Sequence, residues 1–392
     1  MKRTSLVSIV LSLLCLTPLM SASAQDYYFY TNSGGTITVA RYIGPPGDMT
    51  VPDTLNDLPV TEIGSQAFYS QSGIAGVTIP DSVTLISGSA FASCVNMDYV
   101  LFGQGVTEIG DSAFSGCTSL SDVTIPYSVT TLRNQAFHGC TWLTNIVIGQ
   151  SITSMGDATF GGCLRLTSVA IPDSVTSIGT VAFFQCLSLT NVILGSGITN
   201  LGNSAFSSCN LKTIYGRGNA PSLGSSVFSS GEHPTVYYLP EATNWDAFAT
   251  STGFTTVLWN PEIQNISTTF GGSSNLFGFN ITGTANLVVV VEANADLASS
   301  TWAPVGTNTL TGGSSDFSDP NTGSYDQRFY RIHNPFTIPA QYVPQVEEQE
   351  QSQQMMQRGL MQAWSADEVE SDPIMAPLPP PPPMFYESDS GQ

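Results

Sequence analysis

One aromatic residue returns at a fixed interval through the middle of the chain. Phenylalanine occurs every 23 residues, and an eighth copy, Phe228, follows after 22 residues. A unit this short cannot bury its own apolar face, so it becomes stable only when neighbouring copies stack and share one core. The interval therefore predicts a solenoid of 23-residue coils whose phenylalanine rings stack inside it. The seven phased positions are Phe68, Phe91, Phe114, Phe137, Phe160, Phe183 and Phe206.

Two short stretches in each repeat have the pattern of β-strands. Val123 and Ile125 are separated by one residue, as are Val169 and Ile171, so these side chains point to the same, inward side. A second stretch, Val-Thr-x-Ile-Gly at 175–179, predicts another sheet. The Ser- and Ala-rich corner before each Phe has only about five residues, which predicts a single helical or 3₁₀ turn. The fold class is therefore mainly β with short helical turns.

A longer period of 46 residues is superimposed on the first. The residue that follows the first strand alternates between proline and glycine from one repeat to the next. This alternation indicates that the repeating unit is a pair of coils. The alternating residues are Pro80, Gly103, Pro126, Gly149, Pro172 and Gly195.

Together these positions form a recognisable string. Residues 166–186 read Leu-x-x-Val-x-Ile-Pro-x-Ser-Val-Thr-x-Ile-Gly-x-x-Ala-Phe-x-x-Cys. The string closely resembles the BspA-like class of bacterial leucine-rich repeats, and the resemblance extends over residues 59–258. It implies a secreted or surface-displayed solenoid, and several members of the class bind host or matrix proteins. The resemblance implies no catalytic site.

The first 24 residues have the features of a secretory signal peptide. Lys2 and Arg3 precede an apolar run at 6–20, and Ala22-Ser23-Ala24 forms a cleavage site of small residues. We therefore expect an exported chain that begins at Gln25 and is secreted or held at the cell surface. No later stretch has the roughly 18 apolar residues that cross a bilayer, so the mature chain is expected to have no membrane span.

The charge balance excludes some classes of partner. The chain has 30 acidic and 10 basic residues, for a formal net charge of −20. Nucleic acids and anionic membranes both attract clusters of Lys and Arg, so neither is an expected partner. Charged residues make up only 10% of the chain, against about 25% in an ordinary soluble domain. The polar surface must therefore consist largely of Ser, Thr, Asn and Gly.

The repeat accounts for only part of the chain. Residues 25–58 depart from it and are expected to form an N-terminal cap, and residues 59–260 contain the solenoid with its C-terminal cap. Short apolar stretches at 276–281, 287–292, 302–305, near Phe317 and at 328–332 predict a small β-sandwich-like domain over 263–334. Residues 335–392 are acidic and rich in Gln and Pro, which predicts a disordered tail.

Six of the seven cysteines also repeat, three residues after each Phe. An even number in an exported protein can indicate disulfides, and neighbouring coils lie within the permitted Cα separation. The Cβ vectors should run parallel, however, and cysteine is often fully buried, which favours free thiols in the core. A line of stacked sulfurs does not give the tetrahedron that zinc needs, so no metal or other cofactor is predicted. The six are Cys94, Cys117, Cys140, Cys163, Cys186 and Cys209.

Apolar residues also occupy an outward position of the first strand in alternate coils. With coils about 4.8 Å apart, Leu101, Val147 and Ile193 predict an exposed apolar ladder with a spacing of about 10 Å. Such a ladder would suit a ligand. The alternative is that β-branched residues simply suit strands and were copied with the pair of coils. The candidate ligand-binding residues are Tyr99, Leu101, Asp122, Thr124, Asn145, Val147, Asn191 and Ile193.

The sequence offers no catalytic constellation. His138, His233 and His333 are scattered, and no serine lies in a nucleophile-elbow motif. Asp81 and Asp173 follow strand-ending prolines, where aspartate commonly bonds its own backbone in a turn.

The sequence thus predicts an exported, non-enzymatic binding or adhesion protein whose solenoid sheet faces an extracellular protein or glycan. A structural component of the cell envelope or matrix is the alternative. A hydrolase carried by residues 263–334 is a weaker third possibility, because no paired titratable residues can be named for it.

Overall fold

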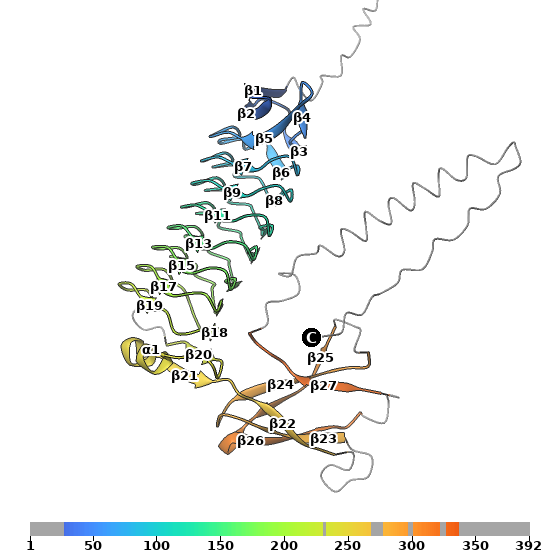
Figure 1. Cartoon of the computed structure of the whole chain (residues 1–392), viewed down its shortest axis with the longest axis vertical. Helices are drawn as coiled ribbons and strands as arrows, with labels where there is room; N and C mark the ends of the chain where they lie inside the picture. Colours follow the sequence, from blue (N-terminus) through green and yellow to red (C-terminus); the bar gives the residue numbers. More distant parts are fainter. Residues whose placement is uncertain (1–26, 230–232, 268–276, 297–300, 322–326, 337–392) are drawn as a thin grey trace, which may run out of the picture. The chain divides into compact units, whose positions relative to one another are not determined.

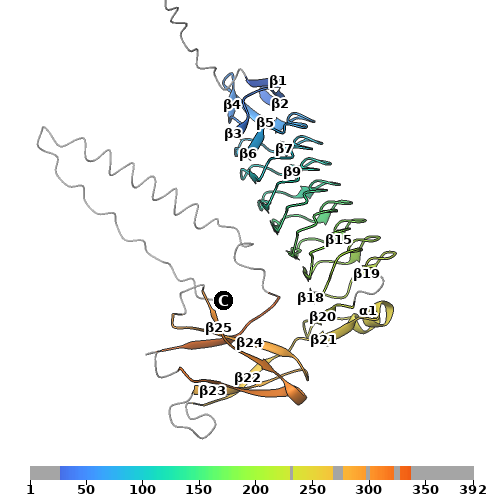
Figure 2. The same ribbon diagram turned by 180° about the vertical axis from the view of Figure 1, so that it is seen from behind.

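The computed structural model describes residues 27–229, 233–267, 277–296, 301–321 and 327–336 (Figures 1 and 2). These residues form a solenoid of stacked β coils followed by two small β-sheets. Strand pairing joins residues 23 positions apart, as in Asp122 with Asn145. The predicted mainly β solenoid is therefore confirmed. The predicted signal peptide at 1–24 lies outside the described residues, as does the predicted disordered tail of 335–392 apart from Pro335 and Phe336, and Phe336 is buried.

An eleven-stranded sheet, here called sheet A, forms one side of the coils (Figure 1). It opens with the antiparallel pair β1 and β2, and from β2 onward each strand on the main path runs parallel to its neighbour in the next coil. Its strands are β1 (Tyr28–Ser33), β2 (Thr36–Tyr42), β4 (Thr54–Leu55), β5 (Leu58–Ile63), β7 (Leu85–Ile86), β9 (Glu108–Ile109), β11 (Thr131–Leu132), β13 (Ser154–Met155), β15 (Ser177–Ile178), β17 (Asn200–Leu201) and β19 (Ser222–Leu223).

The second side of the coils, here called sheet B, consists of two five-stranded parallel sheets that follow one another along the solenoid. Its inward residues, such as Val123 and Val169, are buried in the core as their period-two spacing predicts. The first part contains β3 (Gly47–Thr50), β6 (Ile74–Thr78), β8 (Tyr99–Leu101), β10 (Asp122–Thr124) and β12 (Asn145–Val147). The second contains β14 (Ser168–Ala170), β16 (Asn191–Leu194), β18 (Thr213–Gly216), β20 (Thr235–Tyr238) and β21 (Thr255–Leu258).

The phenylalanine stack runs through the core between the two sheets. The seven rings from Phe68 to Phe206 are fully buried, with consecutive centroids 4.6–5.6 Å apart and interplanar angles of 2–18°. Tyr42 covers the first ring at 5.3 Å, and Phe254 lies 5.0 Å from Phe228 at the other end. The predicted internal stack is confirmed, and aromatic side chains close both of its ends.

The corner around each phenylalanine is built from successive turns and is not the single helical or 3₁₀ turn that its length predicts. Ser89 and Ser93 have φ values of 56° and 62°, in the left-handed region. The amide of Ala92 bonds Ser89 within the coil, whereas the amide of Phe91 bonds the carbonyl of Ala113 in the next coil. A continuous helix would use every amide inside its own coil. The alternation leaves every second amide free to join neighbouring coils.

The cysteines lie in a line beside the phenylalanine stack. Five are buried free thiols, and Cys209 at the end is half-buried. Each thiol donates a hydrogen bond to the carbonyl oxygen of the phenylalanine one coil earlier, at 3.0–3.4 Å. Burial raises the pKa of Cys94 to about 11 and that of Cys140 and Cys186 to about 12. The predicted buried thiols are thus confirmed, and they act as hydrogen-bond donors in the core.

The alternation of proline and glycine has a steric cause. A Cβ added to Gly149 would lie 2.2 Å from the carbonyl oxygen of Pro126, and one added to Gly195 would lie 2.1 Å from that of Pro172. Such distances are far below van der Waals contact. Each glycine therefore allows its coil to approach the proline corner of the coil before it.

Replacing Gly149 with alanine is expected to lower the free energy of unfolding by about 1–3 kcal/mol, because backbone must shift to admit the methyl group. Gly88 is the matched control: its added Cβ would lie 3.4 Å from the nearest atom, an ordinary contact. Urea denaturation followed by circular dichroism measures both variants. Equal stability of Gly149→Ala and Gly88→Ala would contradict the steric explanation.

The last coil is followed by a helix, α1 (Trp245–Thr252), which the sequence pattern did not indicate. Trp245 and Phe248 of this helix are buried, so it packs its aromatic residues onto the end of the solenoid core. Its backbone ends at Gly253, whose φ of 74° suits a residue without a side chain. None of the helices in the described residues has the length and apolar character needed to cross a membrane.

Two three-stranded antiparallel sheets follow the solenoid and enclose a separate core. Phe279, Val289 and Val291 are buried in that core together with Phe317. All five predicted stretches coincide with strands, and β22 was not predicted. One sheet contains β22 (Glu262–Ser267), β23 (Phe277–Thr282) and β26 (Ser314–Asp319). The other contains β25 (Ala303–Thr309), β24 (Val288–Asn294) and β27 (Phe329–Ile332), and the 3₁₀ turn η3 (Thr311–Gly313) precedes β26.

Candidate binding surface

The predicted ligand-binding residues share the outward face of sheet B. Parallel pairing sets Tyr99 beside Asp122 and Asp122 beside Asn145, which form one column with Asn191 farther along. A second column contains Leu101, Thr124, Val147 and Ile193. Their side chains point away from the phenylalanine stack because they alternate with the inward residues.

The exposed apolar ladder expected from Leu101, Val147 and Ile193 is only partly correct. Leu101 is 56% exposed, but Val147 is 7% exposed and Ile193 is half-buried. Val147 and Ile193 form a small apolar cluster with Ala170, which is 3% exposed and lies between them. Contact between neighbouring rungs removes these side chains from water. Leu101 stands apart because Thr124 separates it from the cluster.

The open part of the surface lies on β8 and β10. Tyr99, Leu101, Asp122 and Thr124 are exposed or half-buried there. The ring of Tyr99 lies over Gly76, where an added Cβ would be 2.0 Å from a ring carbon. The absence of a side chain at Gly76 thus allows this ring to lie flat on the sheet.

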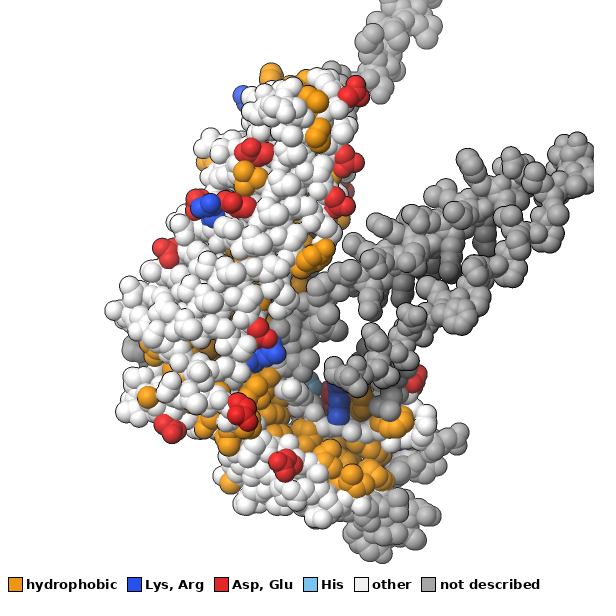
Figure 3. Space-filling view, in the orientation of Figure 1, with side chains coloured by type: hydrophobic (Ala, Val, Ile, Leu, Met, Phe, Trp, Pro, Cys, Tyr) orange, Lys and Arg blue, Asp and Glu red, His pale blue; other side chains and the backbone are white. Residues whose placement is uncertain are grey.

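Acidic side chains surround this open area. Partial burial, a hydrogen bond with Asp48 and the charge of Asp98 raise the pKa of the Tyr99 hydroxyl. Asp122 is exposed on the adjacent strand. The area therefore combines an aromatic ring, one large apolar side chain and three carboxylates. Elsewhere the visible face of the solenoid has few charged side chains (Figure 3).

The second half of the outward face carries aromatic residues that were not among the predicted binding residues. Tyr215 and Tyr237 continue the column of Ile193 and stack at 5.6 Å. Phe336 packs edge-on against Tyr215 at 5.4 Å, and Trp259 packs edge-on against Tyr237 at 6.0 Å. The interval shortens from 23 to 22 residues in these last coils, so the 23-residue register of the earlier coils does not point to the two tyrosines.

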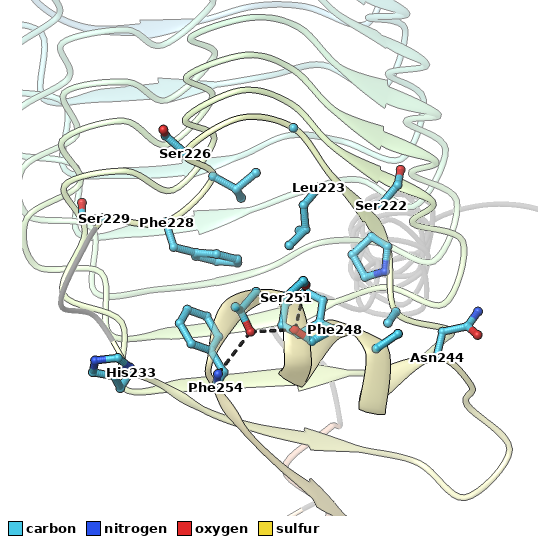
Figure 4. A pocket seen from close by; sticks show the side chains of 16 residues that line it. Ser222, Leu223, Ser226, Phe228, Ser229, His233, Asn244, Phe248, Ser251 and Phe254 are labelled. Carbon is cyan, nitrogen blue, oxygen red and sulfur yellow. Dashed lines mark hydrogen bonds between the residues drawn. The ribbon is translucent and has the colours of Figure 1, made fainter.

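A cavity of about 750 Å³ lies between the last coil and α1 (Figure 4). Phe228, Phe248 and Phe254 project into it, with Ser222 and Ser226 along the coil. His233 is the one titratable side chain among the described residues that line it. The cavity thus provides a largely apolar hollow at the end of the phenylalanine stack, and the described residues that line it do not pair an acid with a base.

Several other titratable groups make structural contacts. Asp81 and Asp173 accept backbone hydrogen bonds at 2.7 Å from Gln104 and Ser196 in the next coil. The expectation that they bond their own turns is therefore wrong, because the close stacking of coils offers them a nearer amide. His138 is exposed, and His333 contacts Glu292 at 2.9 Å. Among the residues that the structure describes, no three His, Cys, Asp or Glu side chains gather to hold a metal.

A second exposed feature lies at the corner before sheet B and was not predicted. Trp142 is 52% exposed, and the guanidinium of Arg165 in the next coil lies 3.5 Å from the centre of its ring. Val95, Leu164 and Leu187 are exposed at the repeat position just before that of Trp142. These five residues are called the corner ridge below.

The chain has clear similarity to one protein family. Residues 54–166 and 153–277 match the family described as the BspA type leucine rich repeat region, in six copies. The two stretches together span more than half of the chain. No curated protein matches the sequence.

Solved structures of bacterial leucine-rich repeat proteins are also similar. A leucine rich cell surface protein from Faecalibacterium prausnitzii is 34% identical, with a TM-score of 0.45 over 49% of this chain and 53% of that one, so this chain spans about half of that protein's length. A leucine-rich repeat protein from Bacteroides ovatus is 24% identical, with a TM-score of 0.40 over 59% and 75%. The T. pallidum leucine rich repeat protein is 22% identical, with a TM-score of 0.39 over 60% and 97%.

Proposed function

Because the chain belongs to the BspA-type leucine-rich repeat family, we propose that it is an exported, non-enzymatic binding protein. The signal features of residues 1–24 support secretion or display at the cell surface, with a mature chain that starts at Gln25. The observation that carries the proposal is the open area of sheet B around Leu101. This area is rigid, since hydrogen bonds join its strands to both neighbouring coils.

The chemistry of the open area limits its ligand. Tyr99 and Leu101 provide apolar contact, and aromatic side chains are favoured at protein interfaces. Asp48, Asp98 and Asp122 repel anionic partners. We therefore propose an extracellular protein with basic groups, or a neutral glycan, as the ligand. Anionic glycans and nucleic acids are unsuitable because the whole chain has a net charge of −20.

Replacing Thr124 with arginine is expected to weaken ligand binding at least about tenfold, since a long cation would occupy the centre of the open area. The measurement is biolayer interferometry of the full mature chain against immobilised extracellular proteins and neutral glycans. Ser154, exposed on sheet A, provides the matched control Ser154→Arg. Equal affinity of a ligand for the wild type and for Thr124→Arg would mean that the open area is not the binding site.

The corner ridge favours a second function, that of a structural scaffold in the cell envelope or matrix. Trp142 and Leu187 are exposed on a regular solenoid edge, and such apolar residues suit lateral contact between copies. Sedimentation of the mature chain distinguishes the two functions. A scaffold requires concentration-dependent assembly that Trp142→Ser abolishes. For a binding protein, the sedimentation of the chain should be the same with and without that substitution.

A further inference from the structure

The cavity at the end of the solenoid lies where sheet A stops. Sheet A ends at β19, whereas sheet B continues beyond the same coil with β20 and β21. Among the described residues, no strand pairs with the far side of β19. The helix α1 lies across this opening, and the cavity remains between the helix and the edge of the sheet (Figure 4). Its volume of about 750 Å³ is within the range of ligand sites. The cavity therefore occupies the place that a further strand of sheet A would take.

Two backbone carbonyls at this edge have no partner. In the preceding coil the carbonyl oxygens of Thr199 and Leu201 accept hydrogen bonds from amides of the last coil at 2.9 and 2.8 Å. Their counterparts 22 residues later are Pro221 and Leu223, and both residues line the cavity. Neither carbonyl accepts a hydrogen bond from another described residue. The edge thus keeps two acceptors at the spacing that joins one coil to the next.

Two backbone amides of the last coil are unpaired as well. In the preceding coil the amides of Ser204 and Phe206 donate hydrogen bonds of 2.9 Å to carbonyls of the last coil. Their counterparts, Ser226 and Phe228, line the cavity and donate no backbone hydrogen bond to another described residue. Unpaired N–H and C=O groups at a sheet edge are a template for pairing with another chain. The last coil offers two acceptors followed by two donors.

The apolar side chains at this edge are incompletely covered. Leu223 is half-buried, whereas Leu201, at the same position one coil earlier, is 0% exposed. Phe228 is also half-buried, but Phe254 lies 5.0 Å and Phe248 lies 6.2 Å from its ring. These two rings take the place of the next phenylalanine of the stack and leave the strand position beside Leu223 open. The cavity therefore suits an aliphatic side chain and not a further aromatic ring.

The lining of the cavity favours an uncharged ligand. None of the described residues that line it is Asp, Glu, Lys or Arg. The hydroxyls of Ser251 and Thr252 already donate to the carbonyl oxygen of Phe248, at 2.9 and 2.8 Å. A charged side chain would lose its water there without gaining a partner of opposite charge. Recognition must therefore depend on backbone hydrogen bonds and on the aliphatic contact.

We propose that the cavity binds a short, uncharged, extended segment of a partner protein, which adds one parallel strand to sheet A beside β19. Two amides of the segment donate to Pro221 and Leu223, and two of its carbonyls accept from Ser226 and Phe228. One aliphatic side chain packs beside Leu223. In this mode the main-chain hydrogen bonds provide affinity and the side-chain pocket provides specificity. The site is separate from the open area of sheet B, and it continues the contact that each coil makes with its neighbour.

The direction of β1 argues against a second copy of the chain as the occupant. β1 is the opposite edge of sheet A and is antiparallel to β2, whereas β2 is parallel to β5. A copy stacked end to end would therefore present an antiparallel strand to β19. Such a contact would not reproduce the parallel pairing that the coils use.

A synthetic peptide tests the site. The probe copies residues 199–205, Thr-Asn-Leu-Gly-Asn-Ser-Ala, which are uncharged and pair with β19 from its other side. It is acetylated, amidated and labelled through a flexible linker, and fluorescence anisotropy with the full mature chain is expected to show saturable binding. Methylation of the Asn200 and Gly202 amides, which would donate to Pro221 and Leu223, should weaken binding about tenfold or more.

The control peptide is methylated on the amide of Leu201, which alternation along the strand points away from β19. Its affinity should equal that of the unmodified peptide. Equal affinity of the doubly methylated and unmodified peptides would overturn the proposal, and so would the absence of saturable binding by the unmodified peptide.

Substitutions on α1 locate the peptide. Ala247 is exposed and lines the cavity, so Ala247→Trp is expected to obstruct it and to weaken peptide binding about tenfold or more. Thr250→Trp, exposed on the same helix outside the lining, is the matched control and should bind like the wild type. Circular dichroism checks that both variants fold. Thr124→Arg should also leave peptide binding unchanged, so the test is independent of the open area.

Two results would reassign the cavity. Peptide binding that Ala247→Trp leaves unaltered would place the peptide on another surface. Self-association of the wild-type chain that Ala247→Trp abolishes, measured by sedimentation without peptide, would give the cavity to a second copy. Either result contradicts the proposal.

Discussion

Replacing Phe137 with alanine is expected to lower the free energy of unfolding by about 3–5 kcal/mol, the usual cost of deleting a fully buried phenylalanine. The ring lies at the middle of the stack, 5.2 Å from Phe114 and 5.6 Å from Phe160. Its loss leaves a cavity that the neighbouring coils cannot fill without breaking their hydrogen bonds. Because coils contact only their neighbours, the gap should also weaken coupling between the two halves of the solenoid.

Urea denaturation monitored by circular dichroism measures this loss, and a broader or two-step transition would report the uncoupling. Tyr69→Ala is the control, since Tyr69 is an exposed aromatic residue next to Phe68. Its substitution should change stability by less than about 0.5 kcal/mol. Similar losses for Phe137→Ala and Tyr69→Ala would mean that the phenylalanine stack does not stabilise the fold.

Raising the pH from 9 to about 11 is expected to unfold the solenoid under reducing conditions. The ordinary pKa of a thiol is 9.0, and burial raises it to about 12 at Cys140 and Cys186. Above pH 9 the unfolded chain therefore releases protons that the folded chain retains. The contribution of the thiols to stability is therefore constant below about pH 9. It decreases above that pH, as the pH rises towards and through the folded pKa values.

The expected size follows from the number of thiols. Each buried thiol should remove roughly 1 kcal/mol per pH unit, so the five together remove about 5 kcal/mol per unit. A typical domain has only about 5–15 kcal/mol to lose. Urea midpoints at several pH values, with reductant present, give the slope. Replacing Cys140 with alanine should reduce that slope by about a fifth, and an unchanged slope would contradict a buried thiol at this position.

The repeating part of the fold could be predicted because identical local rules recur in every coil. Phe137 and Val123 pack against the equivalent residues of the adjacent coils, and the same is true of the equivalent residue in each other coil. The spacing in the sequence is therefore enough to place these side chains in the core. The corner turns could not be predicted in the same way. Left-handed backbone at Ser89 and Ser93 arises from bonding to the next coil, and the sequence within one coil does not record that constraint.

The binding surface was only half predictable. The register placed Tyr99 and Leu101 on the outward face of sheet B, as the alternation of strand residues requires. The burial of Val147 depends on tertiary packing and not on its own strand. The helix α1 could not be predicted from the sequence. It has only one short apolar face, formed by Trp245 and Phe248, and no side chain caps its N-terminus.

Hydroxyl-radical footprinting of the mature chain, with and without a ligand identified by the binding assay, tests the proposed surface most directly. Tyr99 and Leu101 are expected to lose oxidation when the ligand binds, while Trp142 on the corner ridge keeps its oxidation. Protection of Trp142 with no change at Tyr99 and Leu101 would contradict a ligand site on the open area of sheet B.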